Sequence, residues 1–268
     1  EACAWRLAGE PYAGLADMRL TACTPEAAGA PIVFSALGVR EALEIEPRFA
    51  RAGALLFSNA AAFRMEPDVP LLIPEANPDH LGLLAAQRAA RGWSGAILTN
   101  PNCTTTLLVL CLAPLHAAFG VQAAVVATLQ AVSGAGLPGV ASLDLLGNAI
   151  PFIQGEEPKV EAETGKILGR LEAGRIAPAP LALSAHCHRV PVIDGHLEAL
   201  SVRLACAPSP EQVAEHLAAW RTVPQERGLP SAPDPVIRIH AEPDRPQPRL
   251  DAERDGGMSL HVGRIRPC

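Results

Sequence analysis

A single cysteine lies between a strand-like segment and a long apolar run. Residues 95–100 read GAILTN, Pro101 and Asn102 follow, and Cys103 opens a run that continues to Gly120. The first amide groups of a helix have no partner within it and favour negative charge. We therefore expect Asn102 or Cys103 to cap a helix and expect a lowered pKa for the Cys103 thiol. The alternative is a small buried hydrophobic residue, the common fate of a free cysteine.

The segments that must position this cysteine alternate between two patterns. Short apolar runs at residues 30–38, 54–60, 69–74 and 95–100 are strand-like. Helical spacing, with a closing glycine, occupies residues 39–53 and 79–92, and Asp79 is a candidate N-cap. Such alternation is typical of a doubly wound α/β domain with a parallel sheet.

Beyond Cys103 the pattern changes. Residues 104–120 are apolar nearly all round, which predicts a buried helix. The further predictions are a strand and glycine-rich turn at 121–139, an amphipathic helix at 156–174, a turn at Asp194-Gly195, a half-buried strand at 196–205, a helix near 211–222, and strands at 235–241 and 258–266.

The bulk composition excludes several classes of protein. The chain has 268 residues and a net charge of −6, which gives no basic footprint for nucleic acid or for an anionic membrane. We find no membrane span and no signal peptide. Seven scattered cysteines without a CxxC pair favour neither a disulfide framework nor a zinc site, so we predict no metal and a reducing cytoplasm.

Five ordered segments resemble the aspartate-semialdehyde dehydrogenase family, in the branch typical of archaea and fungi. They read TNPNCTTT, LQAVSGAGLPG, IPFIQGEEPKVEAET, HRVPVIDGHLEALSV and DRPQPRLDAERDGGMSLHVGRIR. The resemblance implies a partial doubly wound, Rossmann-like NADP-binding domain over residues 1–102. It also implies an α+β catalytic and dimerisation domain over residues 103–268, as in glyceraldehyde-3-phosphate dehydrogenase.

The resemblance implies a reaction as well. NADP-dependent reductive dephosphorylation converts L-aspartyl 4-phosphate to L-aspartate 4-semialdehyde, in the biosynthesis of lysine, threonine and methionine. Cys103 matches the thiolate nucleophile that forms a thioester, which NADPH then reduces. His196 matches the acid/base histidine, although alone it would be a satisfied histidine at a strand start.

Several charged and polar residues match ligand contacts of the family. Arg189 matches the arginine that binds the substrate α-carboxylate, for which a planar fork is suited. Arg64 and Lys159 resemble the phosphate contacts, with Asn102 beside them. The remaining matches are Glu157 for the substrate amine, Gln130 for an active-site glutamine, and Ser35, Asn59, Ser133, Gly134, Ala135 and Gly136 for the cofactor.

Two features of the family have no counterpart here. Residues 1–30 contain no glycine-rich dinucleotide loop after a strand, and the chain ends at GRIRPC, before the family's last helix. We therefore expect a chain truncated at both ends, lacking its first βαβ unit, with weak or no activity by itself.

Other interpretations stay open. Malonyl-CoA reductase is the main alternative, because it shares the fold and the cysteine motif. N-acetyl-glutamyl-phosphate reductase fits less well, because its cysteine motif and the sequence around that motif differ. A non-catalytic, self-associating fragment is a third alternative. A cysteine hydrolase would use Cys103 and His196. It would not explain the cationic residues Arg64, Lys159 and Arg189. The expected partners are the small-molecule substrate, phosphate and a second copy of the chain, as a homodimer or homotetramer, with no nucleic acid and no membrane.

Overall fold

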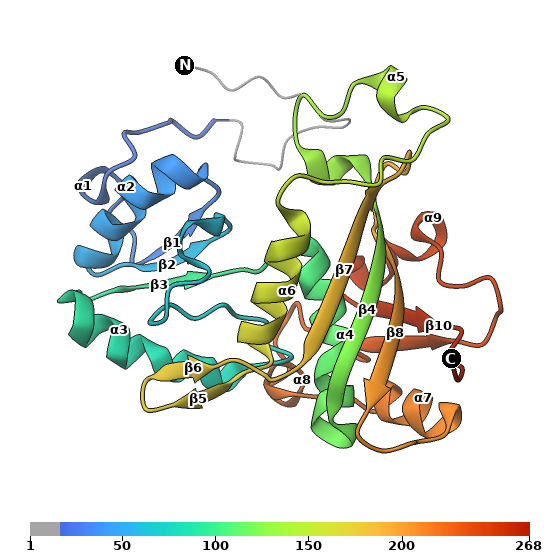
Figure 1. The fold of residues 1–268 in the computed structure, drawn as a ribbon. Helices are drawn as coiled ribbons and strands as arrows, with labels where there is room; N and C mark the ends of the chain where they lie inside the picture. The colour runs from blue at the N-terminus through green and yellow to red at the C-terminus, as the bar shows by residue number, and fades with distance from the viewer. Residues whose placement is uncertain (1–16) are drawn as a thin grey trace.

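A three-stranded parallel sheet forms the first half of the molecule. The structure is a computed structural model that describes residues 17–268 (Figure 1). The strands β1 (Ile32–Ser35), β2 (Leu55–Ser58) and β3 (Ala96–Thr99) lie in that order. They are in register, so Ser35, Ser58 and Thr99 share the carboxyl edge. The three strands predicted here are confirmed, and ligands of open α/β sheets bind at this edge.

The helices of this half are α1 (Pro25–Ala28), α2 (Val39–Arg51) and α3 (Leu83–Arg91), with 3₁₀ turns η1 (Ala61–Phe63) and η2 (Pro78–Gly82). Two predictions are wrong. Residues 69–74 form only an isolated bridge, Leu71 to Thr99, beside β3. Asp79 lies inside η2 and caps nothing, because Pro78 starts that 3₁₀ turn and α3 begins only after Gly82.

The second half is built on a mixed sheet in the order β7-β4-β8 (Figure 1). The central strand β4 (Val121–Gln130) pairs parallel with β7 (Ala182–Arg189) and antiparallel with β8 (Leu197–Leu204). The helix α4 (Cys103–Phe119) packs against this sheet and α6 (Glu156–Ile167). The strand β7 was not among the predicted elements.

The predicted helix at 156–174 ends early. After α6 the chain forms a hairpin of β5 (Arg170–Glu172) and β6 (Arg175–Ala177). The turn between them uses Ala173 and Gly174 at positive φ. Gly169 marks the exit from the helix, because a Cβ there would lie 2.5 Å from the Ala177 carbonyl oxygen. The hairpin therefore approaches the end of the helix too closely for any side chain at this position.

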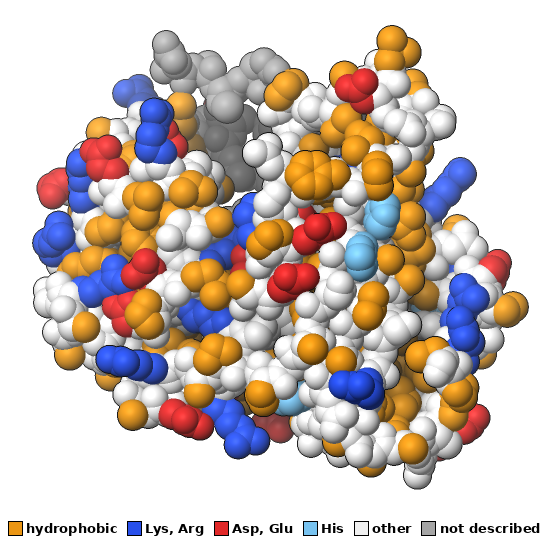
Figure 2. All heavy atoms as spheres, viewed as in Figure 1, with side chains coloured by type: hydrophobic (Ala, Val, Ile, Leu, Met, Phe, Trp, Pro, Cys, Tyr) orange, Lys and Arg blue, Asp and Glu red, His pale blue; other side chains and the backbone are white. Residues whose placement is uncertain are grey.

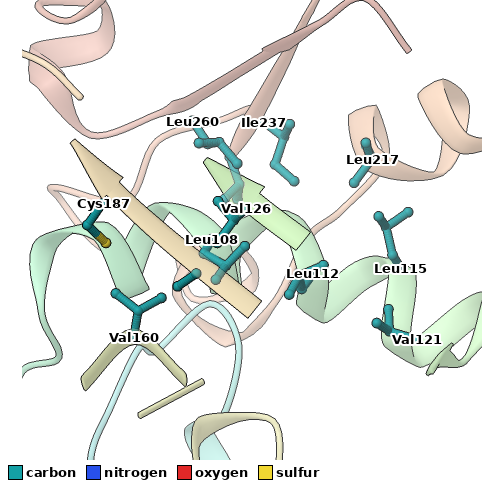
Figure 3. Close-up of a cluster of buried hydrophobic side chains, with 12 residues drawn as sticks. Leu108, Leu112, Leu115, Val121, Val126, Val160, Cys187, Leu217, Ile237 and Leu260 are labelled. Atoms are coloured by element: carbon teal, nitrogen blue, oxygen red, sulfur yellow. The ribbon is translucent and has the colours of Figure 1, made fainter. Parts of the chain in front are cut away.

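The main hydrophobic core surrounds α4, as its uniformly apolar sequence predicts. Leu108 and Leu112 are fully buried against Val126 of β4 and Val160 of α6 (Figure 3). The remaining elements complete this half: η3 (Val132–Ala135), α5 (Ser142–Leu145), α7 (Pro210–Ala218), α8 (Val223–Glu226), β9 (Ile237–His240), α9 (Pro248–Asp251), η4 (Arg254–Gly257) and β10 (Leu260–Gly263). The strands β9 and β10 pair in parallel. Among residues 17–268, no helix is long and apolar enough to span a membrane.

Candidate active site

The cysteine at the head of α4 faces a histidine from the start of β8. Asn102 is the N-cap, and its Oδ1 accepts from the Thr104 amide at 2.9 Å and the Thr105 amide at 3.2 Å. Cys103 is therefore the first residue of the helix. The His196 Nε2 lies 3.2 Å from the Cys103 Sγ. A thiol and an imidazole at this distance are the parts of a nucleophile with its acid/base partner.

The backbone fixes the tautomer of His196. The Ala131 amide donates to the His196 Nδ1 at 3.0 Å, so this nitrogen carries a lone pair. In the neutral ring the proton is then on Nε2, which points at the Cys103 sulfur. An imidazolium would place a second proton against the Ala131 amide. Burial lowers the pKa of His196, and the positive charge of Arg189 lowers it further, which agrees with a neutral ring.

The expectation of an acidified thiol is wrong for this structure. Cys103 can be reached from solvent, but protein atoms crowd its sulfur. Partial burial raises the pKa of Cys103, and the negative charge of Glu156 raises it further, whereas hydrogen bonds at the helix start oppose both effects. These shifts favour a thiol beside a neutral imidazole in the unliganded site.

The carboxylate beside this pair is Glu156, which sequence reasoning missed. Glu156 is buried, and its Oε1 accepts from the Asn102 Nδ2 at 2.8 Å. Glu157, the predicted residue, instead accepts from the Cys187 amide at 3.0 Å. Successive helical residues point about 100° apart, so only one of the two carboxylates can face the cysteine. The only sign of Glu156 in the sequence is that EEPK contains two adjacent glutamates, either of which could have been the one in the site.

Arg189 and the turn after β4 complete one side of the site. The Arg189 Nη1 donates to the Ala131 carbonyl at 2.5 Å, and within the described chain this is the only hydrogen bond of its guanidinium. A Cβ at Gly134 would lie 3.2 Å from the Arg189 Nη1 and 3.3 Å from the His196 Cε1. Glycine therefore lets the turn 133–136 approach both side chains.

A buried ion pair connects the segment after β2 to the turn at Asn102 that precedes α4. The Glu163 carboxylate accepts from the Arg64 Nη1 at 3.0 Å and from the Asn102 amide at 2.6 Å. The Arg64 Nη2 donates to the Asn59 carbonyl, and its buried Nε has no partner in the described chain. Lys159 is exposed on the first turn of α6, and it makes no hydrogen bond among the described residues.

Comparisons with known proteins agree with this architecture. Residues 4–84 match the model of the semialdehyde dehydrogenase NAD-binding domain, and residues 112–268 match the semialdehyde dehydrogenase dimerisation domain. The aspartate-semialdehyde dehydrogenase of Methanothermobacter thermautotrophicus is 46% identical over 97% of this chain and 79% of its own length. The chain belongs to the aspartate-semialdehyde dehydrogenase family.

Other members of the aspartate-semialdehyde dehydrogenase family give the same result. The Archaeoglobus fulgidus protein is 52% identical over 93% of this chain and 71% of its own. A crystal structure of the Candida albicans enzyme with NADP superposes with a TM-score of 0.90, at 40% identity, over 99% of this chain and 77% of that one. The archaeal and fungal resemblance and the fold class are therefore confirmed.

The predicted cofactor residues lie in two places. Ser35 and Asn59 follow the carboxyl edge of β1 and β2, where the Ser35 hydroxyl donates to Glu46 and the Asn59 amide donates to the Ser35 carbonyl. The turn 133–136 lies beside Cys103's partner His196. Gln130 is buried at the end of β4 and donates to the Thr128 hydroxyl at 3.3 Å; it bonds neither Cys103 nor His196. The prediction about residues 1–30 falls largely outside the described residues.

Proposed function

We propose that this chain carries the NADP-dependent aspartate-semialdehyde dehydrogenase reaction, with Cys103 as nucleophile. The 3.2 Å contact between the Cys103 Sγ and the His196 Nε2, at the head of a capped helix, carries the proposal. The family relatives bear this name, and a relative of known structure was crystallised with NADP. The product is a precursor in amino-acid biosynthesis.

The residues support a stepwise reaction. The Cys103 sulfur attacks the acyl carbon of aspartyl phosphate, the carbon–oxygen bond to phosphate breaks to leave a thioester, and the thiol proton leaves with the released phosphate as hydrogenphosphate. NADPH supplies the hydride that reduces this thioester when it is bound. The His196 Nε2–H points at the reacting sulfur, where it can hydrogen-bond to the oxygen on which charge develops and then to the departing thiolate, which takes its proton from solvent.

Charged groups around the pair fit an amino acid phosphate. Arg189, with donors still free, is suited to the α-carboxylate. We assign Glu156 rather than Glu157 to the substrate ammonium, because only Glu156 faces the cysteine. Lys159 and Asn102 remain the proposed phosphate contacts. The unpartnered Nε of Arg64 fits an anionic group at the first sheet, with Ser35, Asn59 and the turn 133–136 as the proposed cofactor contacts.

We further propose the organisation of the whole protein. Residues 1–102 form the cofactor domain and residues 103–268 the catalytic and dimerisation domain. Two copies associate through the open face of the β7-β4-β8 sheet as a homodimer, or as a pair of dimers. This face exposes Val125 and Leu129, and Figure 2 shows hydrophobic side chains and histidines over this part of the molecule. The six described cysteines are all free thiols, which supports a cytoplasmic location.

Kinetics in the reverse direction test the proposal, with aspartate semialdehyde, phosphate and NADP as substrates, on this chain and on the same sequence extended to the full length of its relatives. Arg189→Leu should raise the KM for aspartate semialdehyde about ten- to a hundred-fold, because a hydrogen bond to a charged group contributes about 1.5–3 kcal/mol. Lys159→Leu should instead raise the KM for phosphate. A wild-type reaction that does not depend on phosphate, or faster reduction of malonyl-CoA, would contradict the proposal.

A further inference from the structure

A cluster of two histidines and an aspartate lies outside the proposed active site. His240 ends β9, His261 lies in β10, and Asp251 ends α9. Their side chains are nearly buried, with exposed fractions of 8%, 8% and 4%. The His240 Nε2 lies 2.9 Å from the His261 Nδ1, and the Asp251 Oδ1 lies 3.8 and 3.9 Å from these two nitrogens. The reaction proposed above uses none of the three residues.

These spacings match a metal site. Three atoms at these separations have a common point about 2.1 Å from each, which is the bond length of zinc to imidazole nitrogen and to carboxylate oxygen. We propose that His240, Asp251 and His261 bind a divalent transition metal of the zinc class. Two imidazoles and one carboxylate select such ions over magnesium and calcium, which prefer oxygen ligands alone.

The outer nitrogen of His261 has a hydrogen-bond acceptor, and the outer nitrogen of His240 lies near a carboxylate. The Ser259 hydroxyl donates to Asp255 at 2.6 Å, so its oxygen accepts from the His261 Nε2 at 3.2 Å. That contact places the His261 proton on Nε2 and leaves the Nδ1 lone pair facing the cluster. The His240 Nδ1 lies 3.7 Å from the Glu242 carboxylate. Ligating histidines characteristically direct their second nitrogen to such groups, which orient the ring.

Asp251 supplies the negative charge. Arg245 bonds both of its oxygens and the Gln247 amide bonds one, so the pKa of Asp251 is held far below its usual range. The metal would share the Oδ1 with Arg245, and Arg254 lies 3.5 Å from the same atom. These cations weaken binding, so we expect lower affinity than in a closed four-ligand zinc site. Binding through the His240 Nε2 would require the proton of this ring to be on Nδ1, the nitrogen that faces Glu242.

Binding of Zn²⁺ by the Cys103→Ala chain tests the proposal. This substitution removes the thiol beside His196, which would otherwise compete for zinc. Calorimetry should show one Zn²⁺ per chain, and Co²⁺ should give the visible absorption of a tetrahedral site. His240→Gln and His261→Gln should each weaken binding at least tenfold. The matched control, His186→Gln on the exposed face of β7, should leave it unchanged.

A second measurement does not depend on how well the variants fold. In the Cys103→Ala chain, Zn²⁺ should shift the imidazole ¹⁵N resonances of His240 and His261 while those of His186 stay in place. The proposal is overturned if the resonances of His240 and His261 do not move at saturating Zn²⁺. It is equally overturned if a folded double variant, His240→Gln with His261→Gln, binds Zn²⁺ as tightly as its parent.

Discussion

Glu156 and His196 act on the Cys103 thiol in different ways. The carboxylate of Glu156 is close enough to raise the pKa of Cys103, and the His196 Nε2–H can donate to the sulfur. A substrate ammonium held by Glu156 would offset the negative charge next to the sulfur. We infer that the nucleophile becomes more acidic when the substrate is in place, which limits side reactions of the empty enzyme.

Glu156→Gln should therefore lower the pKa of Cys103 in the free protein. The rate of Cys103 alkylation by iodoacetamide, followed at this site by mass spectrometry, should reach its half-maximum at a lower pH in the variant. Glu157→Gln is the matched control, since its carboxylate bonds the Cys187 amide and lies away from the sulfur. Identical pH profiles for wild type and Glu156→Gln would contradict the assignment.

Glu198 of β8 should make stability depend on pH. Burial raises the pKa of Glu198 to about 8, so the folded state keeps a proton that the unfolded state releases between about pH 4.5 and 8. The free energy of unfolding should fall across this window, by an amount on the order of 3 kcal/mol. In Glu198→Gln this fall should largely disappear, as measured by urea unfolding at pH 5 and pH 8. Glu215→Gln is the control, because Glu215 is exposed and should leave the fall unchanged. An equal fall in wild type and Glu198→Gln would show that Glu198 does not cause the pH dependence.

Some features of the site could be predicted from the sequence, and others could not. The pattern around Asn102 and Cys103 predicted a capped helix, because that signal is local. The choice between Glu156 and Glu157 depends on how α6 is rotated against β7, which adjacent identical residues do not encode. The pKa of Cys103 likewise depends on burial by distant segments, and a rule based on helix position alone gave the wrong direction.

At the scale of elements, Glu163 of α6 joins the start of α4 to the first sheet. Its two oxygens are used fully, by the Arg64 guanidinium and the Asn102 amide, and the side chain is almost completely buried. Lys166, one turn further on, donates to the carbonyls of Arg64, Glu66 and Val69. Cys103, the proposed nucleophile, is therefore positioned by contacts that cross between the two halves of the molecule.

Glu163→Gln should destabilise the fold and impair catalysis together. Removing one partner of a buried ion pair costs about 3–5 kcal/mol, because the other charge stays buried without compensation. We expect a loss of that size in chemical unfolding and a lower kcat, since a glutamine side chain has one acceptor oxygen and cannot serve both the Arg64 guanidinium and the Asn102 N–H. Glu161→Gln on the same helix is the control, because Glu161 is exposed and bonds only the Ala185 amide. Wild-type stability and kcat in Glu163→Gln would show that this junction does not position the cysteine.

Two errors in the predicted strands have different causes. The strand β7 reads ALSAHCHR, with serine and histidines on its open face, so it lacks the apolar alternation of a half-buried strand. Its conformation comes from eight residue pairs with β4. The apolar run at 69–74 was predicted as a strand, but it is buried beside β3 and pairs with it only through the bridge from Leu71 to Thr99. The extent of pairing with distant strands therefore decides both outcomes, and the local sequence does not encode it.

At the scale of the whole molecule, the open face of the β7-β4-β8 sheet is the feature that points to self-association. Val125 and Leu129 of β4 are 49% and 39% exposed although they lie on the central strand. Their neighbours across the sheet are Ser184 and Ser201 beside Val125, and His188 and Leu197 beside Leu129. A flat face of this kind becomes a stable core only when a second copy covers it.

Val125→Asp should convert the assembly to monomers, because a charge at the centre of an apolar interface remains unpaired and desolvated. Sedimentation velocity on the wild type and the variant measures this directly. Leu229→Asp is the control, since Leu229 is also about half exposed but lies outside this sheet. A variant that sediments as the wild type would place the interface elsewhere.

The position of β4 at the centre of its sheet has a consequence during synthesis. Its parallel neighbour β7 begins about fifty residues after β4 ends, and β8 follows later still. At 5–20 residues per second, a nascent β4 waits about 3–10 s with both edges unpaired. The sequence VQAAVVATLQ carries no charge. Nothing on this strand therefore opposes its pairing with the same strand of another nascent chain, made by the next ribosome on the same mRNA. The nascent chain is thus most exposed to aggregation in the interval before β4 pairs with its neighbours, when a ribosome-bound chaperone would protect it most.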